Sequence, residues 1–144
     1  MPHVEAAREL LAPREDVWAF LAEPYHLADW WPGIQGVQPD RKGLAPGARW
    51  LLNAGPQTGG FVGTFLRRPE TTQTLVVMEV REGQHVRFLF TIDGVEADIT
   101  LEPAPESHTR VTIELDGPWS RLNRSLPRKA LSRLYALCQT ASDL

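Results

Sequence analysis

Residues 86–101 read VRFLFTIDGVEADITL, and this stretch decides the fold class. Apolar side chains occupy every second position from Val86 to Ile92, and again from Val95 to Leu101. Period-two alternation is typical of a strand with one buried face. The Asp93-Gly94 pair between the two runs is a strong signal for a tight hairpin turn. The stretch therefore predicts an antiparallel hairpin with one apolar face.

The same alternation extends to both sides of this hairpin. Residues 111–116 (VTIELD) and 49–54 (RWLLNA) each place apolar side chains at every second position. Residues 61–66 and 74–80 are apolar on both faces, so their register stays open. Glycine and proline pairs separate the runs, and such short connections favour antiparallel neighbours. We expect about six antiparallel strands between residues 34 and 116.

Helices and one further strand flank this region. Residues 3–12 (HVEAARELLA) predict a strand with Arg8 on its apolar face, beside Val4, Ala6 and Leu10. A helix is expected to begin near Pro13, because proline suits the first turn of a helix. An apolar stripe follows, and Pro24 ends this helix. Residues 25–31 (YHLADWW) predict a second short helix.

A long amphipathic helix is expected at the end of the chain. From Leu126 to Ala141 the apolar residues recur at spacings of three and four. Pro127 either kinks this helix or begins it, with Ser125 as N-cap. One helix must then cover the apolar face of a sheet of about seven strands. Such a sheet curls around the helix, and we expect the interior to keep a cavity of the kind that holds small molecules.

Length and composition agree with one globular domain over residues 1–144. The apolar fraction is 42% and the charged fraction 23%, which excludes disorder as the main state. The sequence contains no run of 18 apolar residues, so it predicts no membrane-spanning helix. Charges near the N-terminus do not fit a signal peptide, so we expect a cytoplasmic protein. Cys138 is the single cysteine and the four histidines are scattered, so we predict no disulfide, metal or cofactor.

Charge is distributed unevenly. The chain has net charge −3, yet residues 120–144 hold five bases and one acid, leaving −7 on the remainder. An acidic body argues against nucleic acid as a partner. The basic segment is either a solvated helix face or a contact for a phosphate or an anionic lipid.

Several short motifs resemble the START-like (SRPBCC) superfamily. Leu10–Pro13, Val17-Trp18, Phe20-Leu21 and Glu23-Pro24 resemble its opening segment, while Leu27, Trp30-Trp31-Pro32 and Val37 resemble the next. The polyketide cyclase/dehydratase-like and coenzyme Q-binding-like branch is the most similar. The resemblance implies an α+β helix-grip fold: a curved antiparallel sheet around the C-terminal helix, with two short helices after the first strand. It also implies a tunnel for lipids, polyketides or other hydrophobic ligands, and catalysis in some members.

Large apolar side chains supply the candidate ligand-binding residues, because aromatic walls offer wide contact surfaces to flat ligands. Ordinary core packing is the alternative for each of them. The candidates are Trp30, Trp31, Trp50, Phe61, Phe65, Met78, Phe88, Phe90, Ile99, Ile113, Leu134, Tyr135 and Cys138.

Three polar residues are candidates for catalysis. Arg8 shares a face with apolar neighbours, Glu79 would face inward in one register of its strand, and Tyr135 could present its hydroxyl to a cavity. The alternatives are an exposed edge position or ion pair for Arg8 and a rim position for Tyr135.

Three functions follow from these observations. The favoured one is binding or transport of a small hydrophobic molecule, by a monomer or a homodimer with no integral membrane association. An aromatase/cyclase-type enzyme needs a general acid or base in the pocket. A regulatory module would use the basic segment or an exposed tryptophan to contact another macromolecule.

Overall fold

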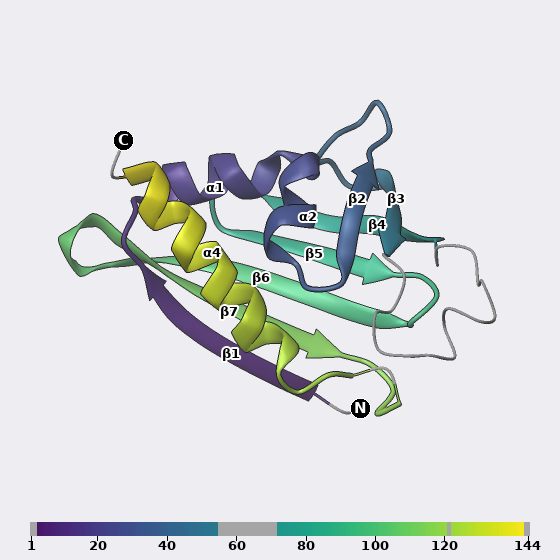
Figure 1. The fold of residues 1–144 in the computed structure, drawn as a ribbon. Helices are drawn as coiled ribbons and strands as arrows, with labels where there is room; N and C mark the ends of the chain where they lie inside the picture. The colour runs from purple at the N-terminus through teal and green to yellow at the C-terminus, as the bar shows by residue number, and fades with distance from the viewer. Residues whose placement is uncertain (1–2, 55–71, 121, 143–144) are drawn as a thin grey trace.

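The computed structural model describes residues 3–54, 72–120 and 122–142. Phe61 and Phe65, with the open register of 61–66, lie outside these ranges. The described strands form one antiparallel seven-stranded sheet in the order β1-β7-β6-β5-β4-β3-β2 (Figure 1). The strands are β1 (His3–Leu10), β2 (Ile34–Gln38), β3 (Arg49–Ala54), β4 (Thr72–Arg81), β5 (His85–Phe90), β6 (Val95–Ala104) and β7 (His108–Asp116).

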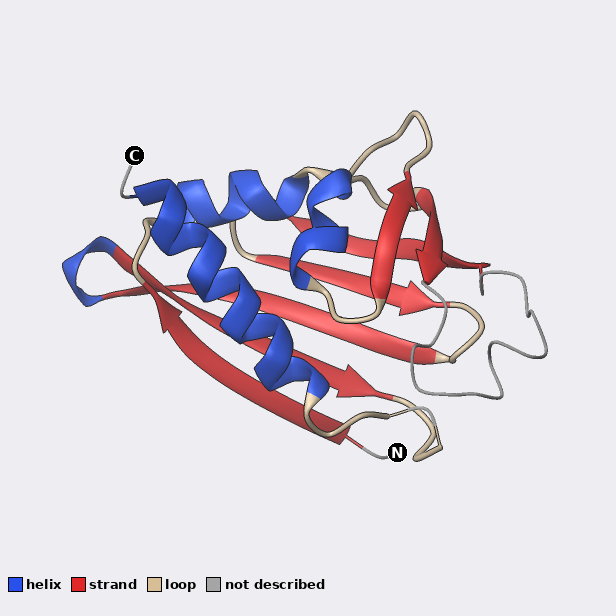
Figure 2. Cartoon of the chain, viewed as in Figure 1, coloured by secondary structure: helices blue, strands red, loops and turns tan. Residues whose placement is uncertain are grey.

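The described helices lie on one face of this sheet (Figure 2). No described helix covers the other face, which is called the bare face below. They are α1 (Arg14–Ala22), α2 (Leu27–Trp30) and α4 (Leu126–Ser142), with short 3-10 turns at Pro24–His26 and Pro105–Ser107. The last helix, α4, crosses the sheet diagonally and packs mainly on β1, with further contacts to β7 and α2. This arrangement is the expected α+β helix-grip. No helix in the described ranges is long and apolar enough to span a membrane.

The hairpin predicted from residues 86–101 is confirmed. Phe90 pairs with Val95 across the turn, and Gly94 has a φ of +66°, which glycine adopts at no steric cost. Val86, Phe88 and Phe90 are buried on the helix-covered face. The alternating pattern therefore located both strands and the side of the sheet that faces the core, except at Ile92. Because β5 ends at Phe90, Ile92 lies in the turn and is 55% exposed, although the alternation placed it inward.

The strand with the open register, β4, contains an irregularity. Leu75 and Val77 are buried, but the pairing with β5 shifts between Val77 and Glu79, which leaves Met78 without a partner in that ladder. Such a β-bulge redirects the side chains that follow it. Glu79 consequently pairs with Arg87 on the bare face.

The flanking segments differ slightly from expectation. The first strand ends at Leu10 and not at residue 12, and Pro13 is the residue before α1 and does not lie in its first turn. Residues 25–31 divide into a 3-10 turn and the single-turn helix α2. Pro127 lies in the first turn of α4, where its missing N–H leaves no helical hydrogen bond unmade, so it begins the helix and does not kink it.

Candidate functional site

A cavity of about 200 Å³ opens between α2, the start of α4 and one end of the sheet. It lies on the helix-covered face, close to the turn between β5 and β6. Its walls are mostly apolar and come from segments far apart in the sequence. The described lining residues are Trp31, Pro32, Gly33, Ile34, Leu52, Gln73, Phe90, Asp93, Val95, Leu115, Asn123 and Leu126.

Two stacked aromatic rings form one wall of the cavity. The ring centroids of Trp31 and Phe90 are 5.3 Å apart, and their planes are inclined by 26°. Trp30 packs edge-on against Trp31 at 5.4 Å, behind the wall. Pro32 and Gly33 follow directly, and Gly33 has a φ of +89° that lets the chain turn from α2 into β2. Residues 30–33 (Trp-Trp-Pro-Gly) therefore supply both an aromatic ring of the cavity wall and the turn from α2 into β2.

Three polar side chains are also part of the lining. The Gln73 side-chain amide donates to an Asp93 carboxylate oxygen at 3.2 Å, and the Gln73 carbonyl accepts from the Ile92 N–H at 3.3 Å. Asn123 accepts hydrogen bonds from the Ser125 hydroxyl at 2.7 Å and the Ser125 N–H at 3.0 Å. These bonds hold the polar groups in fixed positions next to the apolar walls.

Of the predicted ligand-binding residues, Trp31 and Phe90 line this cavity. Others belong to the packed core: Trp30, Trp50, Phe88, Ile99, Ile113, Leu134 and Cys138. Trp50 and Phe88 contact each other at 5.3 Å, and the Trp50 indole N–H donates to the Gly43 carbonyl at 2.8 Å. These seven residues pack in the core, which was the alternative given for each of them.

Met78 is placed differently from the expectation, because it is 46% exposed. Leu75 and Val77 face the core, so strand alternation directs Met78 to the other face, and the shift in pairing after Val77 does not return it to the core. It therefore shares neither the core nor the cavity with the other candidates.

Arg8 and Tyr135 lie together at the edge of the sheet. The Arg8 guanidinium carbon is 4.0 Å from the centroid of the Tyr135 ring, a cation–π contact. Its Nη1 also donates to the Ser132 hydroxyl at 3.4 Å. Arg8 points toward α4, as its place in the sequence pattern predicted, but it is exposed. Neither residue belongs to the described lining of the cavity.

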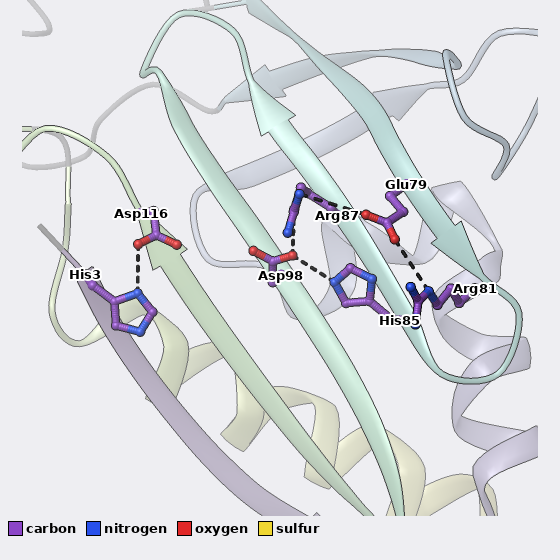
Figure 3. Close-up of polar contacts among 7 residues, drawn as sticks. All are labelled: His3, Glu79, Arg81, His85, Arg87, Asp98 and Asp116. Atoms are coloured by element: carbon purple, nitrogen blue, oxygen red, sulfur yellow. Dashed lines mark hydrogen bonds and ion pairs between the residues drawn. The ribbon is translucent and has the colours of Figure 1, made fainter. Parts of the chain in front are cut away.

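The third catalytic candidate, Glu79, lies on the bare face of the sheet (Figure 3). Its carboxylate is 3.5 Å from Arg81 Nε and 3.9 Å from Arg87 Nη1. Arg87 Nε also donates to Asp98 at 2.8 Å, and this hydrogen bond is the main cause that raises the pKa of Arg87. His85 Nε2 lies 2.8 Å from the same Asp98 oxygen. An open groove runs beside this network, but its charged walls are unsuited to an apolar ligand.

Sequence reasoning missed most of the cavity lining. Leu52, Val95 and Leu115 lie on the apolar face of alternating strands, so the pattern does direct them inward. Which inward residues border a cavity depends on where α2 and α4 stop covering the sheet, and the alternation does not carry that information.

A curved antiparallel sheet around a terminal helix, with an apolar cavity beneath it, defines a helix-grip protein. A family model described as polyketide cyclase / dehydrase and lipid transport matches residues 1–138. The chain belongs to this START-like (SRPBCC) family, as the sequence motifs indicated.

Solved structures share the fold at low sequence identity. Protein NE0264 from Nitrosomonas europaea is 20% identical with a TM-score of 0.71, covering 99% of this chain and 97% of that one. TTHA0849 from Thermus thermophilus is 18% identical with a TM-score of 0.72, covering 98% and 99%. An AHSA1-like protein from Aeromonas hydrophila is 19% identical with a TM-score of 0.67, covering 96% and 94%. No curated protein matches the chain in sequence.

Proposed function

We propose that this protein binds a compact hydrophobic molecule in the cavity beside Trp31 and Phe90, as a carrier or sequestering protein of the cytoplasm. The observation that carries the proposal is the stacked aromatic wall facing an apolar opening in a chain of this family. Apolar walls with a few fixed polar groups are typical of small-molecule sites.

The cavity volume limits the size of the ligand. Ligand pockets commonly have about 300–1,000 Å³, whereas this one has about 200 Å³. A buried apolar cavity of roughly 150 Å³ is enough for benzene. A molecule of about one or two fused rings therefore fits without rearrangement, and the flat Trp31–Phe90 wall suits stacking against such rings.

Binding is favoured over the aromatase/cyclase alternative because of where the catalytic candidates lie. Arg8 and Tyr135 contact each other at the edge of the sheet, and Glu79 pairs with arginines on the opposite face. A general acid or base must reach the reacting group of its substrate. None of the three is among the described lining residues.

The test is titration of 1-naphthol, indole and decanoate, followed by calorimetry and by amide chemical shifts. We expect saturable binding of the two ring compounds, with the largest shifts at Gly33, Val95 and Leu115. Decanoate should bind more weakly, because its chain is flexible and the stacked wall favours a flat ligand.

A matched pair of variants locates the site. Ile34→Trp inserts a bulky ring into the cavity lining, while Ile92→Trp makes the same change at a position that is 55% exposed. We expect Ile34→Trp to weaken binding at least 10-fold and Ile92→Trp to leave it unchanged. Equal affinities in the two variants, or no saturable binding of any probe, would refute the proposal.

A further inference from the structure

The bare face of the sheet brings one histidine and two glutamates together on β1 and β7. The antiparallel register places Glu5 opposite Glu114 and His3 opposite Asp116. One ligand atom from each of His3, Glu5 and Glu114 lies within 4.8 Å of the other two. An ion held among these atoms would need each of them at about 2.0–2.2 Å, the distance that nitrogen and oxygen ligands keep from Zn²⁺.

Both nitrogens of the His3 imidazole face carboxylates. Its Nδ1 lies 2.8 Å from an Asp116 carboxylate oxygen, and its Nε2 lies 3.8 Å from Glu5. Figure 3 draws the contact between His3 and Asp116. In protein metal sites, a carboxylate typically holds one imidazole nitrogen and leaves the other for the ion. The His3–Asp116 pair has this arrangement, and it distinguishes the cluster from a plain group of acidic residues.

The two glutamates also oppose each other electrostatically. Like charges directly across a strand pair destabilise a sheet. A bound cation would replace this repulsion with attraction to both carboxylates.

We propose that His3, Glu5 and Glu114 bind one divalent first-row transition ion, with Zn²⁺ and Mn²⁺ as the representative cases, and that Asp116 positions the imidazole. Imidazole with carboxylate ligands suits these ions, whereas Mg²⁺ prefers oxygen ligands alone. The ion links β1 to β7 on the face opposite the ligand cavity. The site is independent of the proposed function.

The first test is a Zn²⁺ titration of tag-free protein in competition with a chromophoric chelator. We expect one ion per chain. His3→Gln and Glu114→Gln should each weaken binding at least 10-fold, and Asp116→Asn roughly 10-fold, as for other residues that orient a metal-bound histidine.

The matched control is His108→Gln. His108 Nδ1 lies 3.2 Å from Glu9 at the other end of the same strand pair, so it is also a histidine–carboxylate pair. We expect this variant to bind Zn²⁺ as the parent protein does. An equal loss in His108→Gln, or an unchanged affinity in His3→Gln, would overturn the proposal.

Paramagnetic broadening by Mn²⁺ gives a second measurement that needs no variant. Substoichiometric Mn²⁺ should broaden the amide signals of residues 3–5 and 114–116 before any others. Broadening that starts elsewhere, or that is spread over all acidic residues equally, would mean that these three side chains do not form the site.

Discussion

Asp98 offers a sharp test of how the bare face of the sheet is stabilised. This carboxylate is 8% exposed, and one of its oxygens accepts hydrogen bonds from His85 and Arg87, each at 2.8 Å. We predict that Asp98→Ala destabilises the protein, because it leaves the nearly buried His85 ring and the Arg87 guanidinium without their shared acceptor.

The magnitude follows from the exposure of the two donors. A hydrogen bond to a charged group contributes about 1.5–3 kcal/mol when it is shielded from water. The His85 side chain is 17% exposed, so its bond falls near the lower end of that range. Arg87 is 40% exposed, which reduces its share to about 0.5–1 kcal/mol. We expect a total loss of about 2 kcal/mol, or roughly 4–8 °C in Tm for a domain of this size.

Urea and thermal unfolding at pH 7.5, followed by circular dichroism, measure this loss. Glu96→Ala is the matched control, because Glu96 lies on the same strand and face, two residues earlier, and is exposed. It should change stability by less than about 0.5 kcal/mol. If the two variants unfold together, the Asp98 network does not stabilise the sheet.

Three further predictions concern the core and the edge of the sheet. Gly117→Ala places a methyl group 2.9 Å from a valine side chain and should cost about 1–3 kcal/mol in urea unfolding, while Gly36→Ala, whose nearest contact is 3.5 Å, should be milder. Burial raises the pKa of Cys138 to about 11, so a disulfide reagent at pH 8 should label it only as urea unfolds the protein, and rapid labelling of the native state would contradict this. Arg8→Ala should cost about 0.5–1 kcal/mol in the parent and less in a Tyr135→Leu background, where the cation–π contact is already lost and only the contact with Ser132 remains.

The fold could be predicted from the sequence because strand alternation shows which side of the sheet is buried. The run from Val86 to Leu101 and the Asp93-Gly94 turn specify two strands, their connection and their inward face. Met78 was misplaced because β4 is apolar on both faces. The alternation there does not show which side faces the core, and the structure buries Leu75 and Val77 while Met78 is exposed.

Site residues were harder to predict, because they meet across long distances in the chain. Trp31 and Phe90 were recognised by residue type alone, whereas Leu52 and Leu115 look like any inward-facing strand residue. Similarly, the four histidines show no ligand spacing in the sequence. His3 meets Glu114 only because β1 pairs with β7, a neighbour that follows it by more than a hundred residues.

The pairing of β1 with β7 also bears on the order in which the chain folds. Residues 3–10 are synthesised long before residues 108–116, which form the one strand that pairs with them in the described sheet. Chain synthesis adds about 5–20 residues per second, so β1 stays unpaired for roughly 5–20 s before β7 has been made. Charged side chains of β1, such as Glu5 and Glu9, disfavour aggregation of this unpaired strand with other chains, since charges on edge strands resist such pairing. The edge strand β1 can therefore join the sheet only after β7 has been made, and non-local pairing of this kind slows folding.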